Sequence, residues 1–448
     1  MAPLPVTGLI LSGGGARAAY QVGVLAGIAE LLPASAHNPF PVIVGTSAGA
    51  INAVTLASGA THFNDAVQRL TAFWQNFRSH LVIRSDWPGV VRQASRFVGH
   101  SLLGLGGQAP VALLDSSPLR SLLEAHLNLD GIGHSLAAEQ LRAVAVTAFG
   151  YESGQAVTFY QGRGTIEAWL RHRRIGVPTP LTIDHLLASA AIPLLFAPVQ
   201  LGDEFYGDGA VRQSAPISPA LHLGASRVLV VGVSGNPQRP APPLPTQRVF
   251  SGQQPSLAQI GGHMLNSTFI DSLEDDIELL QRLNHLSRLL PAHLDARRLG
   301  LAPIEVLVVA PSQPLDEIAA RHRRELPAAL RLFLRGPGAT RTSGAGVLSY
   351  LLFEASYCSE LIELGRKDAL AKKRSCASSW EFDVACTGLI AGKPAPTGLP
   401  QPWALCGPVT AGLPAIGPKQ VYSAICNLRA WVYTYRTFSY SNGEFSWP

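Results

Sequence analysis

Apolar and polar positions along the first 60 residues alternate in the order strand, turn, helix, strand, turn, helix. The apolar runs at residues 6–11 and 42–44 are short and continuous, which is typical of strands buried on both faces. Residues 20–32 and 50–57 space their apolar side chains as helices do, and Pro33 ends the first helix. Further apolar strands are expected at residues 143–148, 199–201, 227–233 and 304–309. This pattern predicts a three-layer α/β/α sandwich with a mainly parallel sheet.

The remainder of the chain changes character twice. Residues 235–245 hold five prolines and predict a surface loop that ends a core unit at residues 1–235. Residues 236–375 are expected to be a helical or mixed extension of that core. Within this extension, residues 256–290 are a long amphipathic stretch, whose acidic run we interpret as a solvated helix face.

The last segment, residues 376–448, is rich in cysteine, tryptophan and proline. It holds four of the five cysteines and four of the seven tryptophans, and no helical or strand period runs through it. Its cysteines are too widely spaced for a paired C-x₂-C zinc site, so no metal is expected. Disorder, a small additional fold and non-native sequence all stay open for this tail. We expect truncation near residue 375 to leave function intact.

Composition and charge exclude several classes of protein. Hydrophobic residues make up 47% of the 448 residues and charged residues 15%, which excludes a disordered chain. The net charge of +5 is scattered, without the basic stripe and aromatics of a nucleic-acid binder. The start of the chain has no positively charged signal region, and the uncharged residues 38–64 hold two prolines and many polar groups. We therefore expect a cytoplasmic protein without a membrane span, able to contact membranes peripherally.

A candidate nucleophile lies between the second strand and the second helix. The sequence at residues 45–49 is Gly-Thr-Ser-Ala-Gly, which fits G-x-S-x-G. Gly45 and Gly49 have no side chains to obstruct a sharp turn, so we expect Ser47 to be exposed at its apex, as in a nucleophile elbow. The N-terminus of the following helix adds positive potential, which favours an oxyanion.

A glycine-rich turn follows the first strand, with the sequence Ser-Gly-Gly-Gly-Ala-Arg at residues 12–17. Such a turn leaves backbone N–H groups free to converge on an oxyanion or a phosphate. Gly13, Gly15 and Ala18 also fit the G-x-G-x-x-A dinucleotide fingerprint, but no acidic residue ends the second strand as that fingerprint requires. A Walker A loop is excluded because no Gly-Lys-Ser/Thr follows. A tight turn without chemistry is the remaining alternative.

A third candidate is Asp208, which lies between Gly207 and Gly209 after the apolar run at residues 199–201. An aspartate in this position can project into a cleft, although an ordinary Asp-Gly turn has the same sequence. In order, spacing and context, the three motifs together resemble those of the patatin-like phospholipase family. The resemblance covers roughly residues 6–235, and residues 255–375 are similar to the C-terminal part of bacterial members.

This resemblance implies a patatin-like fold and a serine-aspartate dyad without histidine. Ser47 matches the nucleophile and Asp208 the base that is hydrogen-bonded to it. The other matching positions are Gly13, Gly14 and Gly15 in the oxyanion loop, Arg17 beside it, and the motif glycines Gly45, Gly49 and Gly209. Ala18 departs from the family, whose members usually carry glycine there. Because an ordinary aspartate is a weak base, Asp208 is expected to be desolvated, which raises its pKa.

The implied activity is hydrolysis of fatty acyl esters of phospholipids or related lipids, without metal or cofactor. A general carboxylesterase or thioesterase using Ser47 is one alternative, and a non-catalytic lipid-binding scaffold is another. A Ser-His-Asp triad also stays open, because five histidines follow Asp208 in the chain: His222, His263, His285, His293 and His322. The apolar residues 188–198 fit either an acyl cleft or plain core. The aromatic residues between 73 and 97 fit either a lipid-facing cap or a packed helix pair.

Overall fold

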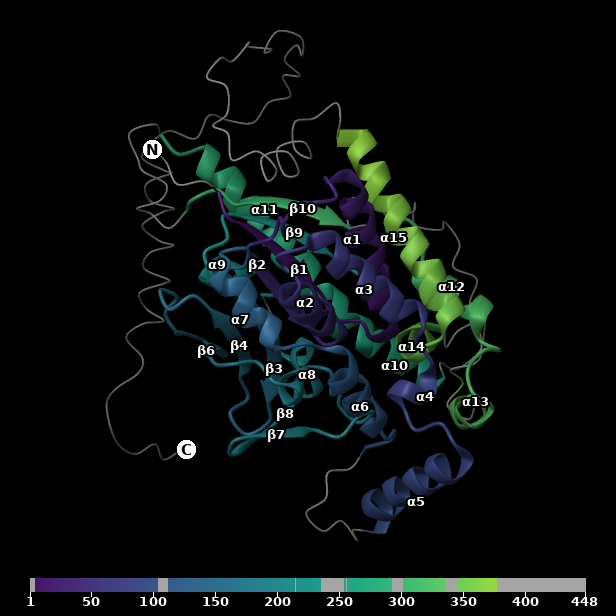
Figure 1. Ribbon diagram of the computed structural model, residues 1–448. Coiled ribbons are helices and arrows are strands. Elements are labelled where there is room, and N and C mark those ends of the chain that lie inside the picture. The colour runs from purple at the N-terminus through teal and green to yellow at the C-terminus, as the bar shows by residue number, and fades with distance from the viewer. Residues whose placement is uncertain are drawn as a thin grey trace, which may run out of the picture. The chain divides into compact units, whose positions relative to one another are not determined.

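Five parallel strands form the centre of the sheet in the computed structural model, in the order β10-β9-β1-β2-β3 (Figure 1). The structure describes residues 5–103, 112–213, 215–234, 254, 256–291, 301–335, 338 and 345–376. The central strands are β1 (Thr7–Leu11), β2 (Val42–Thr46), β3 (Ala143–Gly150), β9 (Arg227–Val231) and β10 (Glu305–Val309). They are nearly continuous apolar runs because helices cover both faces of the sheet. All five were predicted from the sequence, within a few residues at their ends.

The sheet continues beyond β3 through shorter strands with mixed direction. These strands are β4 (Ala156–Gly162), β5 (Trp169–Arg171), β6 (Arg174–Pro178), β7 (Val199–Leu201) and β8 (Glu204–Asp208). β4 and β8 both pair antiparallel with β3, and β7 pairs with β8 as a hairpin. Of these, only β7 was predicted, because the others mix polar and apolar residues or are very short. The parallel expectation therefore holds for the central strands, whereas the outer strands are mostly antiparallel, with β4 and β6 as a parallel pair.

Two hydrophobic clusters, one on each face of the sheet, confirm the layered α/β fold. Leu9, Ile43 and Val231 point into the larger cluster with the helices of one layer. Ile10, Val44 and Val230, their neighbours along the strands, point into the smaller cluster with α9 and α11. The larger layer contains α1 (Ala19–Leu31), α2 (Ala48–Ser58), α3 (Phe63–Gln75), α7 (Asp130–Ala137) and α8 (Ile183–Ser189). The smaller contains α9 (Ser218–His222) and α11 (Ser272–Arg288).

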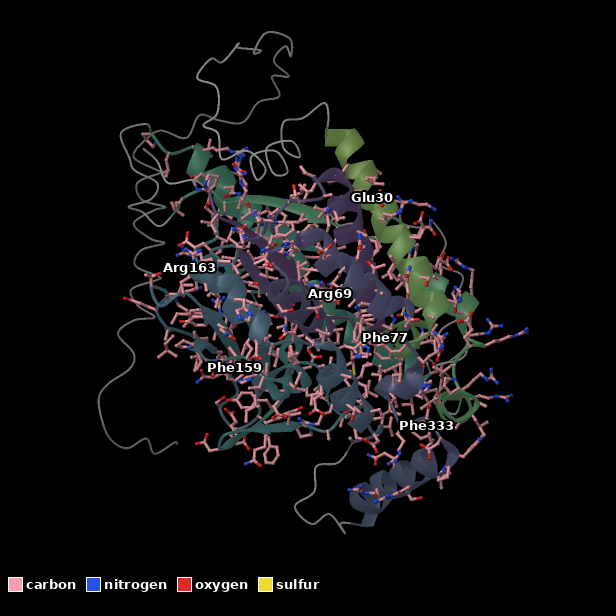
Figure 2. All side chains as sticks on the ribbon, viewed as in Figure 1. Glu30, Arg69, Phe77, Phe159, Arg163 and Phe333 are labelled. Atoms are coloured by element: carbon pink, nitrogen blue, oxygen red, sulfur yellow. The ribbon has the colours of Figure 1, made fainter. Side chains whose placement is uncertain are left out.

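The C-terminal region joins the same layers rather than standing apart. It supplies β10 to the sheet and α15 (Ala355–Cys376), which lies beside α1 and α3 (Figure 1). A methyl group added to Gly23 would collide with the Ile362 carbonyl, and one on Gly365 with the Tyr20 carbonyl, so the two helices approach closely. Glu30, labelled in Figure 2, pairs with Arg366 across this contact. The remaining helices are α4 (Ser79–Val82), α5 (Trp87–Leu103), α6 (Ser117–His126), α10 (Leu257–Asn266), α12 (Leu315–His322), α13 (Ala328–Arg335) and α14 (Ala345–Leu351).

The outer segments of the structure agree with the sequence predictions only in part. The amphipathic stretch 256–290 is two helices, α10 and α11, separated by a π-helical turn, η3 (Ser267–Asp271). Its acidic run is not wholly solvated, because Asp276 accepts a hydrogen bond from the Ile217 N–H at 2.9 Å.

Trp74 and Phe77 are buried in the core, as in a packed helix pair, whereas Trp87 is half exposed. None of the described helices is both long enough and apolar enough to cross a membrane. The predicted proline-rich loop at residues 235–245 and the tail beyond Cys376 lie outside the described residues.

Candidate active site

Ser47 lies at a sharp turn between the end of β2 and the start of α2. Its φ of 56° and ψ of −130° are rare for a residue with a side chain, and such strain is characteristic of functional positions. The glycines on either side permit the turn. A methyl group on Gly45 would come within 2.4 Å of the Gly49 carbonyl oxygen, and one on Gly49 within 2.3 Å of the Leu11 carbonyl oxygen. Gly49 thereby brings α2 directly against the glycine-rich turn that follows β1.

A buried serine that sequence reasoning missed supports this strained backbone. The Ser47 N–H donates to Ser189 Oγ at 2.8 Å, and the Ser189 hydroxyl donates to the Thr147 carbonyl at 2.6 Å. Ser189 ends α8 and is completely buried. It therefore connects the turn at Ser47 to β3. No local motif marks this residue, because the contact joins positions that are far apart in the chain.

Asp208 ends β8 and caps the short 3-10 turn η2 (Gly209–Val211). One carboxylate oxygen, Oδ1, accepts the Ala210 N–H at 3.0 Å, and the Asp208 N–H donates to the Ala191 carbonyl at 2.8 Å. Gly209 packs so tightly on β3 that a methyl group there would come within 2.1 Å of the Thr147 carbonyl oxygen. The aspartate is thus fixed against the same stretch of β3 that anchors Ser189.

The carboxyl group of Asp208 has the electrostatics expected of a base. Burial raises its pKa to about 7, and the Ser47 hydroxyl and the Ala210 N–H lower it by less. The second oxygen, Oδ2, is buried and has no hydrogen-bond partner of regular geometry among the described residues. Ser47 and Asp208 therefore interact, but more loosely than the direct hydrogen bond that the family resemblance implies.

The glycine-rich turn holds its peptide groups in a fixed direction. Gln21 Nε2 donates to the Ser12 carbonyl at 2.7 Å, and Gln21 is in turn held by Asn52, whose Oδ1 accepts from Trp74 Nε1. Because the N–H and C=O of a trans peptide point in opposite directions, the Gly13 N–H faces away from Gln21. In the described part of the chain, the N–H groups of Gly13 and Gly14 form no hydrogen bond. They are available to an oxyanion.

Gly15 begins the 3-10 turn η1 (Gly15–Ala18) with a φ of 54°, where a side chain would be strained. A methyl group on Gly15 would also come within 2.3 Å of the Tyr350 carbonyl oxygen. Ala18, the position that departs from the family pattern, is buried in the same turn, and its carbonyl accepts from Asn52 Nδ2 at 3.1 Å.

Arg17 ties the glycine-rich turn to the C-terminal region. Its Nε donates to Ser349 Oγ at 2.8 Å, and its guanidinium lies 4.1 Å from the centre of the Tyr350 ring. Its Nη1 also reaches Asn266 Oδ1 at 3.5 Å. The side chain is buried, and within the described ranges no carboxylate forms an ion pair with it. This cation is therefore stabilised by hydroxyl groups, an amide and an aromatic face.

Three elements of the C-terminal region, α10, η3 and α14, cover the candidate site, and together they form its roof. A methyl group on Gly13 would come within 2.7 Å of the Phe269 ring and 3.1 Å of Ser47 Cβ, so Phe269 lies beside the nucleophile. The Phe269 ring also contacts Tyr350, with ring centres 5.4 Å apart, and η3 packs against η2 next to Asp208. Beneath this roof, Ser47 is only 2% exposed and Asp208 is completely buried. The expectation that Ser47 is exposed at the apex of its turn is therefore wrong, because Phe269 and its neighbours cover that turn.

The motifs and their geometry agree with a comparison against protein families. Residues 9–221 match the model of the patatin-like phospholipase family. They form a patatin-like domain. The match includes the glycine-rich turn, the Ser47 turn and Asp208, and it assigns the domain to the lipid acyl hydrolases.

The solved structures that match this chain share little sequence with it, and no curated protein matches it. VipD from Legionella pneumophila is 12% identical, with 81% of this chain and 67% of that chain covered and a TM-score of 0.28. A human GIVD cytosolic phospholipase A2 bound to methyl gamma-linolenyl fluorophosphonate is 15% identical, with 86% of this chain and 60% of that chain covered and a TM-score of 0.40. The structure of SpcU in complex with ExoU from Pseudomonas aeruginosa is 14% identical, with 85% of this chain and 80% of that chain covered and a TM-score of 0.24. The chain thus spans 60 to 67% of the first two proteins.

A cavity of about 390 Å³ opens in the patatin-like domain, lined in part by the segment between α8 and β7. Its apolar wall includes Ala190, Ala191 and Phe196, from the segment for which the sequence left acyl cleft or plain core open. The same segment touches both candidate residues, since Ser189 binds the Ser47 N–H and Ala191 binds the Asp208 N–H. Arg96 and Arg120 line the cavity as well, and Arg120 pairs with Asp184. Both the volume and the lining fit a chain-like apolar ligand with a polar end.

Two of the five histidines that could complete a triad, His222 and His322, have other partners. His222 stacks on Trp169, and its Nδ1 contacts the Ser218 carbonyl, while His322 lies between Glu325 and Glu360. His263 and His285 are exposed on α10 and α11, and His293 lies outside the described residues. No hydrogen bond joins a described histidine to Ser47 or Asp208. Within the same residues, no group of three or more His, Cys, Asp or Glu side chains could hold a metal ion.

Proposed function

We propose that this protein hydrolyses fatty acyl esters of phospholipids or related lipids with Ser47 as nucleophile and Asp208 as general base. The observation that carries the proposal is the pairing of a strained serine turn with a completely buried carboxylate whose pKa is raised to about 7. A base with a pKa near the working pH is ionised often enough to act and basic enough to accept a proton.

The reaction proceeds in two halves. Ser47 Oγ attacks the ester carbonyl carbon while its proton moves to Asp208, and the N–H groups of Gly13 and Gly14 stabilise the oxyanion. Collapse of the tetrahedral intermediate breaks the bond to the leaving alcohol, which takes the proton from Asp208. A water molecule then attacks the acyl-enzyme, Asp208 accepts and returns a proton, and the fatty acid leaves. No metal or cofactor takes part in these steps.

The cavity beside Ala190 and Ala191 is the candidate site for the acyl chain. Part of its wall is formed by the segment whose Ser189 and Ala191 bind the Ser47 and Asp208 backbone N–H groups, and this neighbourhood supports its choice as the acyl site. The apolar lining favours a fatty acyl group over a short acid, because each buried methylene contributes about 0.8 kcal/mol. The substrate of this proposal is a long-chain acyl lipid at a membrane surface, and no nucleic acid takes part.

Covalent labelling tests the proposal. A fluorophosphonate probe should label the wild-type protein at Ser47 and leave Ser47→Ala unlabelled, as read by mass mapping of the adduct. Substrate panels varying acyl length, head group and thioester against ester then separate a phospholipase from a general carboxylesterase or thioesterase. A folded wild-type protein that is labelled elsewhere would overturn the assignment of Ser47. One that neither reacts nor hydrolyses any ester would favour a non-catalytic lipid-binding scaffold.

A further inference from the structure

Helix α10 has one face built into the protein and one face that nothing in the described structure covers. On the inner face, Ala258 and Gly262 are buried, and a methyl group on Gly262 would contact the backbone of Gly346 in α14. On the outer face, Leu257, Ile260 and Met264 are 74%, 45% and 66% exposed. Their spacing of three and four residues puts them on one side of the helix.

This outer face is unusual in its charge as well as its exposure. No Asp, Glu, Lys or Arg occurs between Leu257 and Phe269, so α10 carries none of these side chains and the first acidic residue after it is Asp271, at the end of η3. A row of large apolar side chains without a charged rim suits insertion among acyl chains and head groups. The protein as a whole carries a net charge of +5, which favours approach to an anionic membrane.

The same helix leads directly to the candidate active site. It continues into the π-helical turn η3, and π-helical turns frequently mark functional positions. Phe269 in this turn lies against Gly13 and beside Ser47, and all three residues are buried. Asn266 at the end of α10 accepts hydrogen bonds from Tyr350 Oη at 2.9 Å and from Arg17 Nη1. A shift of α10 therefore moves groups that touch the oxyanion loop.

We propose that the outer face of α10, formed by Leu257, Ile260 and Met264, docks this protein on a lipid surface, and that docking draws Phe269 away from Ser47. The proposal rests on the function proposed above, because the surface it names delivers the lipid substrate to that site. A lipid surface is the chosen occupant because the exposed face is apolar, uncharged and continuous with the cover of the nucleophile. The docked helix would open the site only where substrate is present.

Vesicle binding tests the surface. A triple variant with serine in place of Leu257, Ile260 and Met264 should bind phosphatidylcholine–phosphatidylglycerol vesicles about tenfold more weakly or worse, as measured by cosedimentation. Its hydrolysis of the phospholipids in those vesicles should fall to the same extent. Turnover of a monomeric short-chain p-nitrophenyl ester should stay within about twofold of wild type, because that substrate needs no docking. The matched control is the triple serine variant of Leu283, Leu286 and Leu289, which are 38%, 53% and 66% exposed near the end of α11.

Several results would overturn the surface proposal. One is normal vesicle binding by the folded α10 variant, and another is failure of the wild-type protein to bind vesicles. Equal loss in the α11 control would show that exposed leucine in general, and not this face, drives binding. A wild-type dimer that the α10 variant converts to a monomer would assign the face to a second copy of the chain.

Labelling kinetics test the coupling to Phe269 and separate it from the proposed function. Vesicles should accelerate fluorophosphonate labelling of Ser47 in the wild-type protein by about tenfold or more, and Phe269→Ala should label rapidly without vesicles. If Ser47 is labelled equally fast in all these samples, the proposed coupling between docking and Phe269 is wrong, but the assignment of Ser47 as nucleophile is supported. If vesicles bind through α10 but Ser47 is never labelled, even in Phe269→Ala, the docking surface stands and the proposed catalytic function fails.

Discussion

The floor and the roof of the candidate site differ in how they are built. The floor consists of the glycine-rich turn, the Ser47 turn and the Asp208 turn, which are held by tight glycine contacts and by buried side chains such as Gln21 and Ser189. The roof consists of α10, η3 and α14, which meet the floor through the Phe269 ring and the partners of Arg17, and through a close contact between Gly15 and the Tyr350 carbonyl. We expect the floor to be the more rigid of the two, because glycines packed against backbone atoms allow little adjustment. We expect the roof to rearrange more readily where side chains such as Phe269 make its contacts with the floor.

The sharpest test of the floor is Asp208→Asn. The substitution keeps the shape and the contact with the Ala210 N–H but removes the base, so we expect turnover to fall roughly 10³- to 10⁴-fold. Asp203→Asn in the β7–β8 hairpin is the matched control and should retain turnover. Steady-state kinetics and thermal unfolding on both variants check this. Near-normal turnover by a folded Asp208→Asn protein would contradict the dyad and favour a histidine as the general base.

The contact between floor and roof can be tested at Gly13. A methyl group there meets the Phe269 ring and Ser47 Cβ, so Gly13→Ala should reduce turnover by about 10²-fold through displacement of the oxyanion donor. In Gly13→Ala/Phe269→Ala the ring is gone, and part of the loss should be recovered. The double-mutant cycle measures the coupling directly. Independent effects of the two substitutions would show that Phe269 does not press on the oxyanion loop.

The difference between floor and roof also explains what the sequence could reveal. The central strands and the three motifs are local patterns, and Ser47, Gly49 and Asp208 occur where strand and turn periodicity expects them. Phe269 gave no such signal, because its role depends on packing between residues more than 250 positions apart in the chain. The outer strands β4, β5, β6 and β8 were missed for a related reason, since their pairing with the sheet outweighs weak local propensity.

The roof should also control the pH dependence of the reaction. Asp208 must be ionised to act, and burial raises its pKa to about 7, so kcat/KM for a monomeric ester should fall about tenfold from pH 8 to pH 6. Phe269→Ala admits water, lowers this pKa and moves the acidic limb to lower pH. pH–rate profiles of the two proteins check the shift. Identical acidic limbs would show that the roof does not desolvate the carboxyl group.

The smallest effect is expected at Ser189, the hidden support of the floor. Ser189→Ala removes the acceptor of the Ser47 N–H, a hydrogen bond with a net contribution of about 0.5–1.5 kcal/mol, so kcat should fall about three- to tenfold. The matched control is Ser135→Ala, because Ser135 is equally buried but its hydroxyl has no hydrogen-bond partner among the described residues. Both variants lose one buried hydroxyl, and only one loses a contact with the nucleophile turn. If Ser189 positions Ser47, kcat falls in Ser189→Ala alone while KM stays constant; equal kcat values in the two variants would mean that the strained turn is maintained by Gly45 and Gly49 without it.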